Sequence, residues 1–349
     1  MASMPSVFDL WTLAGQSDAG MARWNDALEL INDADTIAIS GHTNPDGDAL
    51  GSVLGLGIAL RRHFPLKKVA LLLADDASVP RVYRFLPAAD KLIWASSYTE
   101  DPDLFISVDA PTLERLENSA GVARRAGKRL CIDHHPSREE FADVVVRDST
   151  SAATAVLISN FLDTASIAIE PAIAMCLFCG LVTDTGRFQY QNANPEAFAC
   201  AARLVDAGAD PARVALEVYQ SQRLEYLHLE SVVLGRIRTV AGGRVAYSFA
   251  TGRDLADCGV AHDECDGLID VVRQVEGVEV CLFLKEGATP GVIRGNLRSK
   301  GALDISQIAA RHNGGGHAAA AGFSFRGTIR EALSTILPEL VELVGERPR

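Results

Sequence analysis

The first residues that could do chemistry lie in GHTNPDGDALGS (41–52), directly after an apolar stretch. His42, Asp46 and Asp48 fall within seven residues of a turn that contains Gly and Pro. Imidazole nitrogen and carboxylate oxygen are ligands for Mn²⁺, Fe²⁺ or Zn²⁺. A buried carboxylate pair would be costly without such a cation. A helix start capped by Asp46 or Asp48, with His42 at the surface, explains the same residues equally well.

Three further segments carry carboxylate or imidazole at the end of an apolar run. Asp109 ends LFISVD, and Asp133, His134 and His135 end KRLCIDHH. Asp184 lies in GLVTDTGRF, at the end of an apolar run and two residues before a glycine. Asp109 before a proline is also typical of a helix cap, and an Asp before Gly is typical of a turn. Adjacent side chains of an extended chain point to opposite faces. One of the two histidines can therefore bind metal while the other faces substrate or packs.

Together these four segments indicate a binuclear metal site rather than four coincidences. The candidate residues are His42, Asp46, Asp48, Asp109, Asp133, His134, His135 and Asp184. They suffice for two divalent ions that lie about 3.5–4 Å apart and share a bridging carboxylate. Such a pair of ions activates a water for in-line attack on phosphorus. No cysteine belongs to the set, and oxygen-rich ligation favours Mn²⁺ or Mg²⁺ over structural zinc.

The elements that must position these residues are predicted strands separated by helices. Strands are expected at 36–40, 68–74, 104–109, 128–135 and, at an edge, 144–148, and helices at 22–33, 49–63, 150–164 and 171–183. Apolar strands alternating with helices indicate a parallel sheet covered on both faces, an open α/β domain. Ligands bind such sheets outside the carboxyl ends of the strands, where three of these strands deliver Asp or His.

The rest of the chain predicts a helical connector and a smaller α+β domain. We expect a metal-binding catalytic domain at 22–190, a connector at 191–232 and a substrate-binding domain at 233–349. Strands are expected at 243–251, 278–286 and 291–299, and helices near 263–275, at 304–312 and from 328. We expect the active site in the cleft between the two domains.

A glycine-rich segment in the second domain could bind phosphate. Asn313 is followed by Gly314, Gly315, Gly316 and His317, and such glycines let backbone amides approach an anion closely. Arg294, Arg298 and Lys300 lie nearby in the sequence and add positive charge. A tight turn without a ligand is the alternative interpretation.

Composition limits the function further. The chain has 349 residues, 48% hydrophobic and 22% charged, with a net charge of −12, which fits two globular domains and argues against binding of duplex DNA. No cationic apolar run opens the chain and no long apolar segment occurs, so we expect a cytoplasmic protein without a membrane span. Cys176 and Cys179 form a CxxC that fits a buried apolar helix better than a redox or zinc pair.

These motifs resemble those of the DHH phosphoesterases. HTNPDGDALGS, SVD at 107–109, DHH at 133–135 and TDTGRF resemble the four motifs of the catalytic domain, and RGNLRSK with GGGHAAAAGF resembles the DHH-associated C-terminal domain. The order is similar to that of the nanoRNase group, bacterial oligoribonucleases that also act on 3′-phosphoadenosine 5′-phosphate or on linear and cyclic dinucleotides. The resemblance extends from about 22 to 345.

The resemblance implies roles for individual residues. His42, Asp46 and Asp109 would hold one Mn²⁺, with Mg²⁺ or Co²⁺ as substitutes. Asp48, Asp109, His134 and Asp184 would hold a second, with Asp109 bridging. His135 would lie beside the substrate phosphate or attacking water, and Asp133 would orient an imidazole. The substrate would be bound by Arg294, Asn296, Arg298, Ser299, Gly314, Gly315, Gly316 and His317. Asn313 and Asn296 depart from the glycine and serine of many relatives, which leaves the substrate preference open.

The resemblance therefore implies an enzyme that hydrolyses short RNA or dinucleotides such as pApA and pGpG to nucleoside 5′-monophosphates. Activity on 3′-phosphoadenosine 5′-phosphate or cyclic dinucleotides, and a homodimer, are compatible with it. An inorganic pyrophosphatase or exopolyphosphatase with the same metal core is the alternative, but that group lacks the GGGH segment. A non-catalytic dinucleotide sensor would be expected to have lost metal ligands.

Overall fold

A computed structural model of the protein describes residues 18–137, 139–301 and 303–345. The chain divides into two compact units, the first ending at Ser221 and the second beginning at Gln222. Most of the opening segment, on which the expectation of no secretory leader rests, lies outside the described residues. Within the described ranges, no helix is long and apolar enough to span a membrane.

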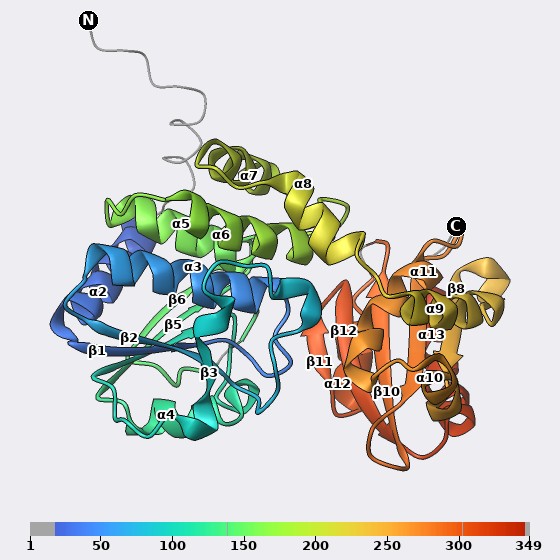
Figure 1. Cartoon of the computed structure of the whole chain (residues 1–349). Coiled ribbons are helices and arrows are strands. Elements are labelled where there is room, and N and C mark those ends of the chain that lie inside the picture. The colour runs from blue at the N-terminus through green and yellow to red at the C-terminus, as the bar shows by residue number, and fades with distance from the viewer. Residues whose placement is uncertain (1–17, 138, 302, 346–349) are drawn as a thin grey trace, which may run out of the picture. The chain divides into compact units, whose positions relative to one another are not determined.

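The first unit is built on a six-stranded parallel sheet (Figure 1). The strands are β1 (Thr36–Ser40), β2 (Lys68–Leu73), β3 (Leu92–Trp94), β4 (Leu104–Val108), β5 (Lys128–Asp133) and β6 (Val144–Arg147), in the order β3-β2-β1-β4-β5-β6. β4 is buried along its whole length and β1 along nearly all of it, which explains their apolar sequences. The predicted parallel α/β sheet is confirmed, and β6 lies at the edge as expected.

Helices cover both faces of this sheet. The helices of this unit are α2 (Asp18–Asp33), α3 (Gly47–His63), α4 (Ser119–Arg125), α5 (Thr154–Thr164), α6 (Pro171–Asp184), α7 (Pro195–Asp206) and α8 (Pro211–Val214). One face packs against α2, α3 and α5 through Ile37 and Ile39, and the other packs against α4 through Ala38 and Phe105. α6 lies outside α3 and α5, with α7 outside α6 (Figure 1).

Glycines bring α3 and α6 unusually close together. Gly47, Gly51 and Gly55 recur every four residues and so lie on one face of α3. A Cβ atom at Gly51 would lie 2.3 Å from the carbonyl oxygen of Cys176, and one at Gly47 would lie 2.4 Å from Oγ1 of Thr183. This close approach places the first turn of α3 beside the last turn of α6, where two of the predicted metal ligands lie.

The two cysteines of the CxxC are buried apolar residues, as expected. Cys176 and Cys179 are both fully buried in α6. Burial raises the pKa of Cys176 strongly and that of Cys179 to about 12, so both thiols are protonated and inert at neutral pH.

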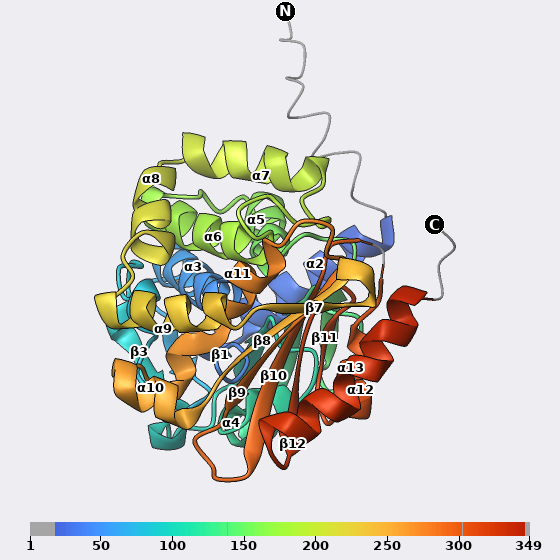
Figure 2. The ribbon, with the colours of Figure 1, turned by 90° about the vertical axis from the view of Figure 1, so that its right-hand side faces the viewer.

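The second unit is a mixed six-stranded sheet (Figure 2). Its strands are β7 (Arg238–Val240), β8 (Val245–Ala250), β9 (Val280–Glu286), β10 (Val292–Ser299), β11 (Gly315–His317) and β12 (Ala320–Arg326), in the order β11-β12-β10-β9-β8-β7. β8 and β9 are parallel and the other neighbours antiparallel. The predicted smaller α+β domain is confirmed.

Helices also cover both faces of the second sheet. They are α9 (Leu224–Gly235), α10 (Gly252–Cys258), α11 (Ile269–Arg273), α12 (Ser306–Arg311) and α13 (Ile329–Gly345). α12 and α13 pack on one face, and α9, α10 and α11 pack on the other. Part of the glycine-rich segment, which the sequence suggested to be a phosphate-binding segment or a tight turn, forms β11 and pairs with β12 as a short hairpin.

Candidate metal centre

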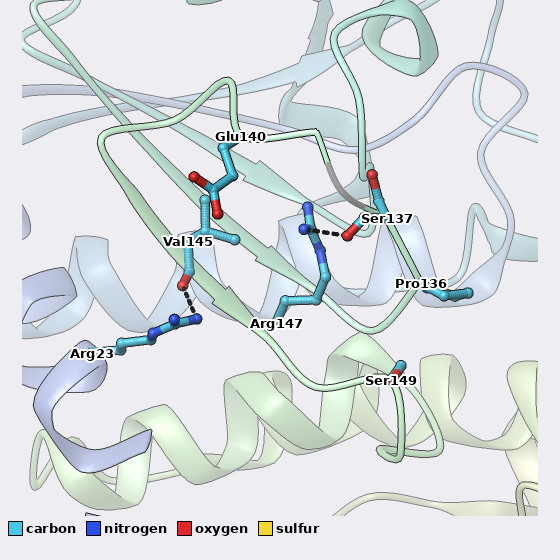
Figure 3. A pocket seen from close by; sticks show the side chains of 7 residues that line it. All are labelled: Arg23, Pro136, Ser137, Glu140, Val145, Arg147 and Ser149. Carbon is cyan, nitrogen blue, oxygen red and sulfur yellow. Dashed lines mark hydrogen bonds between the residues drawn. The ribbon is translucent and has the colours of Figure 1, made fainter. Parts of the chain in front are cut away.

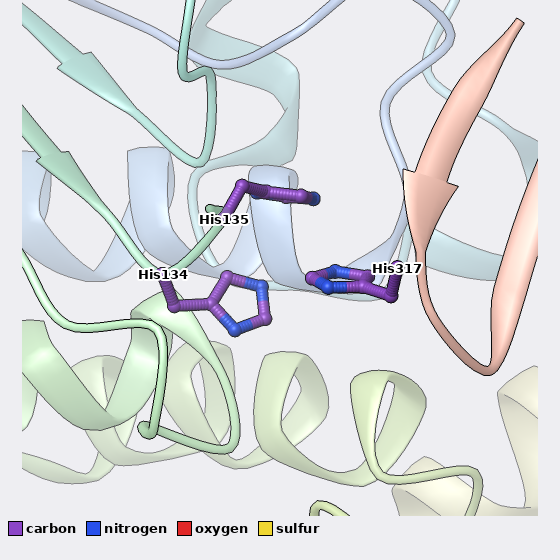
Figure 4. A group of neighbouring side chains, drawn as sticks. All are labelled: His134, His135 and His317. Atoms are coloured by element: carbon purple, nitrogen blue, oxygen red, sulfur yellow. The ribbon is translucent and has the colours of Figure 1, made fainter. Parts of the chain in front are cut away.

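The carboxyl ends of three neighbouring strands deliver the predicted residues to one edge of the first sheet. His42 follows β1 and Asp109 follows β4. His134 and His135 follow β5 (Figure 4). The strand order reverses between β1 and β4, the position where open α/β sheets bind ligands. Asp109 has a φ of 56°, a left-handed conformation that Asp tolerates better than most residues. Such strain in a buried carboxylate is typical of functional sites.

One group of candidate ligands contains His42, Asp46 and Asp109. Nε2 of His42 lies 3.7 Å from Oδ1 of Asp46 and 3.5 Å from Oδ2 of Asp109. Ligand atoms of these residues all lie within 4.8 Å of one another. Asp46 is also the N-cap of α3, because its Oδ1 accepts hydrogen bonds from the amides of Asp48 and Ala49. Capping and cation binding are compatible, since an ionised carboxylate accepts several bonds.

A second group contains Asp48, His134 and Asp184, whose ligand atoms also lie within 4.8 Å of one another. Nε2 of His134 lies 3.9 Å from Oδ2 of Asp48 and 3.6 Å from Oδ2 of Asp184. The same nitrogen lies 3.5 Å from Oδ1 of Asp109. Asp109 therefore presents one oxygen to each group, which is the geometry that a bridging carboxylate needs.

Both imidazoles of these groups are oriented for a cation. Nδ1 of His42 lies 2.7 Å from the carbonyl oxygen of Thr43, and Nδ1 of His134 lies 3.2 Å from that of Ser151. A carbonyl only accepts, so each Nδ1 carries the hydrogen in the neutral ring. Each Nε2 lone pair then points at the carboxylates. Backbone carbonyls commonly fix metal-binding histidines in this tautomer.

The electrostatics of the cluster also favour a cation. Burial, together with Asp109 and Asp184, raises the pKa of Asp48 well above its usual range. Burial likewise raises the pKa of Asp184 to about 6 against the attraction of His134. Asp48 and Asp109 are almost completely buried. A divalent cation would relieve the repulsion among these carboxylates, so the donor set and its charge fit one.

Several supporting residues were not identified from the sequence. The amides of Thr154 and Ala155, at the start of α5, donate to the two oxygens of Asp48 at 2.6 and 2.9 Å. The Thr154 hydroxyl donates to Oδ1 of Asp109 at 3.0 Å. Nδ2 of Asn192 donates to Oδ2 of Asp184 at 3.4 Å. The contacts to Asp48 and Asp109 join segments far apart in the chain, so the sequence carries no local signal of them.

His135 and Asp133 lie beside the two groups. Nδ1 of His135 is 2.9 Å from Oδ1 of Asp133 and 3.5 Å from Oδ1 of Asp109. Asp133 is completely buried. The Nδ1–H of His135 therefore donates to Asp133, in the orienting arrangement that the resemblance implies.

The predicted substrate-binding residues lie in the second unit, and most share one face of its sheet. Side chains alternate along β10, so those of Arg294, Asn296 and Arg298 lie on one face. Through the pairing of β10 with β12 and of β12 with β11, His317 belongs to the same face. Ser299 lies on the opposite face, buried, and its hydroxyl donates to the carbonyl oxygen of Gly301. The structure therefore does not bring Ser299 together with the others.

The three glycines before His317 differ in their surroundings. A Cβ atom at Gly314 would lie 2.0 Å from the carbonyl oxygen of Gly322, and one at Gly316 would lie 2.5 Å from that of Ala320. Close packing of the hairpin thus explains two of the glycines without a ligand. Only at Gly315, among the three, would a Cβ atom meet nothing within 4 Å.

Known proteins share both the sequence pattern and the fold. A bifunctional oligoribonuclease and PAP phosphatase NrnA of Thermus thermophilus is 31% identical over 291 residues, covering 83% of this chain and 84% of that protein. The Bacillus subtilis protein of the same name is 26% identical and covers 85% of this chain and 91% of its own.

A solved structure also has a similar fold. An exopolyphosphatase-related protein from Bacteroides fragilis is 26% identical, with a TM-score of 0.83 over 92% of this chain and 96% of that chain. Residues 36–181 match the N-terminal domain of the DHH family, and residues 242–346 match the DHHA1 domain. The chain therefore belongs to the DHH family of phosphoesterases that carry a C-terminal DHHA1 domain.

Proposed function

We propose that this protein is a Mn²⁺-dependent phosphodiesterase that hydrolyses short oligoribonucleotides and linear dinucleotides to nucleoside 5′-monophosphates. The observation that carries the proposal is the position of Asp109 between two groups of ligand atoms. Two divalent cations bound there would polarise a phosphoryl oxygen and lower the pKa of a water for in-line attack. Mg²⁺ and Co²⁺ are the expected substitutes.

The buried residues around the ligands would fix them before substrate arrives. The amides of Thr154 and Ala155 hold both oxygens of Asp48, which limits the rotation of this carboxylate. The Thr154 hydroxyl similarly holds Asp109. Preorganised ligands cost no rearrangement during the reaction, which is how such sites stabilise developing charge.

His135 would act on the substrate or the attacking water rather than bind a cation firmly. Its Nδ1 contacts Asp133, and the ring would exchange a proton or donate a hydrogen bond through Nε2. An imidazole held by a buried carboxylate has a fixed orientation, which is what proton transfer at a phosphate requires.

We propose that the second unit binds the nucleotide. Arg298 and His317 would contact phosphate, and Arg294 and Asn296, on the same sheet face, would contact the base or sugar. Asn296 already donates from Nδ2 to Oδ1 of Asp266 at 3.1 Å, so its amide oxygen is the group available to a ligand. Of Gly314, Gly315 and Gly316, Gly315 has the most open surroundings.

The relatives support short RNA as the substrate class. The Thermus thermophilus and Bacillus subtilis proteins are named for oligoribonuclease and PAP phosphatase activities, and both align over most of their length. The chain's net charge of −12 disfavours long nucleic acid, since each additional phosphate adds repulsion without basic contacts to offset it.

A hydrolysis assay with Mn²⁺ tests the proposal. It would compare pApA, a long RNA strand, 3′-phosphoadenosine 5′-phosphate and pyrophosphate, with products separated by chromatography. Rapid release of AMP from pApA, with little action on the long strand or on pyrophosphate, is the expected result. Pyrophosphate as the only good substrate would instead assign the chain to the pyrophosphatase branch, and no turnover of any substrate would favour a dinucleotide sensor.

Replacement of the shared carboxylate should nearly abolish this activity. Asp109→Ala removes a ligand from both groups, so we expect kcat/KM for pApA to fall by about a thousandfold or more, about 4 kcal/mol of transition-state stabilisation. Asp101→Ala is the control, because Asp101 is an exposed carboxylate that pairs with Arg125. Near-normal activity of Asp109→Ala would exclude the proposed site.

A further inference from the structure

We propose that Arg147 is a positioning residue for the reaction, holding Asp133 and thereby His135 in their working orientation. The inference rests on the proposed function, because His135 is its point of action. Arg147 is the last residue of β6 and pairs in register with Asp133, the last residue of β5. It is therefore delivered by the sheet to the flank of the candidate centre.

Arg147 forms the outer end of a chain of contacts that reaches His135. Its Nε lies 3.4 Å from Oδ2 of Asp133, while Oδ1 of the same carboxylate accepts from Nδ1 of His135 at 2.9 Å. The Asp133 side chain is completely buried, and the Arg147 side chain is only 13% exposed. A buried carboxylate without a cationic partner is strongly unfavourable, so Arg147 compensates the charge that orients His135.

The two Nη nitrogens of Arg147 donate hydrogen bonds to backbone carbonyl groups in the segments that follow β4 and β5. One Nη atom donates to the carbonyl oxygen of Ser137 at 3.0 Å, and the other donates to those of Pro111 and Glu139 at 3.4 and 3.3 Å. Ser137 and Glu139 lie in the loop that begins directly after His135. Pro111 lies two residues after Asp109. One side chain thus fixes the backbone that follows both β4 and β5.

This combination needs the shape of arginine as well as its charge. A guanidinium group presents five N–H donors in a rigid plane, whereas a lysine ammonium is a compact point charge on a flexible stem. The Arg147 guanidinium group forms an ion pair with one carboxylate and hydrogen bonds with three carbonyl groups, in diverging directions. Lysine could compensate the charge of Asp133 but could not hold both loops at once.

A surface depression next to Arg147 supplies a matched control. It has a volume of about 620 Å³ and is lined by Arg23, Pro136, Ser137, Glu140, Val145, Arg147 and Ser149 (Figure 3). Arg23 reaches into the same depression from α2, where it donates to the carbonyl oxygen of Val145 at 3.2 Å. It makes no ion pair with Asp133 in the described residues. Replacement of Arg23 changes the charge of the depression and leaves the contacts to Asp133 intact.

The test compares Arg147→Met, Arg147→Lys and Arg23→Met with the unaltered protein in pApA hydrolysis with Mn²⁺. We expect kcat to fall about 10–100-fold in Arg147→Met, the usual cost of losing an outer partner of a functional histidine. KM should change little, because the nucleotide-binding candidates are untouched. Arg147→Lys should recover part of kcat, and Arg23→Met should match the unaltered protein.

A second measurement separates this inference from the proposed function. In Mg²⁺-loaded protein, the Nδ1–H of His135 should give a slowly exchanging proton resonance in nuclear magnetic resonance spectra, lost in Arg147→Met and kept in Arg23→Met. Unchanged kcat with an unchanged resonance would overturn the role of Arg147. If the unaltered protein fails to hydrolyse pApA, the proposed function fails, while the resonance still decides whether Arg147 positions His135.

Discussion

Asp109 lies between the two groups of candidate ligands, with its Oδ2 3.5 Å from His42 and its Oδ1 3.5 Å from His134. Burial disfavours its charged form, but attraction to His42 and His135 lowers the pKa of Asp109 below its usual value. The carboxylate is therefore ionised at neutral pH, as a cation ligand must be. Its left-handed backbone, at φ 56°, turns it toward both groups.

Cation binding should release protons from the two imidazoles. Burial disfavours charge on His42, but Asp109 and Asp46 outweigh it and raise its pKa from 6.5 to about 10. Burial disfavours charge on His134 as well, but the neighbouring carboxylates, first Asp184, raise its pKa to about 9. In the cation-free protein, both rings are thus protonated at neutral pH. A metal needs the neutral ring, so Mn²⁺ affinity should rise as the pH rises toward 9.

Calorimetric titration of Mn²⁺ in buffers of different ionisation enthalpy would measure this proton release. We expect release at neutral pH and less of it as the pH approaches about 9. Affinity that is independent of pH over this interval, with no proton release, would mean that neither imidazole binds the cation.

At the residue scale, the sequence predicted the candidate ligands but not the residues that hydrogen-bond to them. His42, Asp109 and the histidines after β5 could be recognised because each ends an apolar run. Thr154 and Asn192 could not, because each contacts its carboxylate only through tertiary packing. The family resemblance implied that Ser299 binds substrate together with Arg298, whereas the alternation of β10 places their side chains on opposite faces.

At the scale of elements, the contact between α3 and α6 sets the distance between Asp48 and Asp184. A Cβ atom at Gly180 of α6 would lie 2.7 Å from Oδ1 of Asp48, and one at Gly51 of α3 would clash with the α6 backbone. The glycines therefore control the geometry of the second ligand group. Their helical positions lower helix propensity, a cost that close packing offsets.

Gly51→Ala should separate the helices and destabilise the protein. The added methyl group would lie 2.3 Å from the carbonyl oxygen of Cys176, so we expect a loss of about 1–3 kcal/mol in the free energy of unfolding. Denaturant unfolding measures it. Gly235→Ala is the control, since a Cβ atom there meets nothing within 4 Å. Equal stability of the two variants would show that α3 and α6 can accommodate the methyl group.

The sequence predicted the long, buried strands better than the short ones. The expected strand at 36–40 matches β1, and 128–135 contains β5, because their apolar runs are continuous. β3 and β7 are three residues each and largely exposed, so they carry no such signal. The glycine-rich segment was interpreted as a phosphate-binding segment or a tight turn, but residues 315–317 pair with β12 as a strand although glycine disfavours strands.

At the scale of the whole molecule, the two units have different roles in the proposed function, cation binding and nucleotide binding. The candidate ligands of the two groups around Asp109 belong to the first unit, and the candidate nucleotide-binding residues belong to the second. The division falls after Ser221, inside the stretch 191–232 that the sequence predicts to be a helical connector. Two units with separate hydrophobic cores are what a chain of 349 residues is expected to form.

The central claim is that this chain holds a pair of divalent cations around Asp109. Anomalous diffraction at the manganese edge, from crystals grown with Mn²⁺, tests it most directly. The account predicts two peaks about 3.5–4 Å apart, one among His42, Asp46 and Asp109 and the other among Asp48, His134 and Asp184. A single peak, or none at these residues, would contradict it.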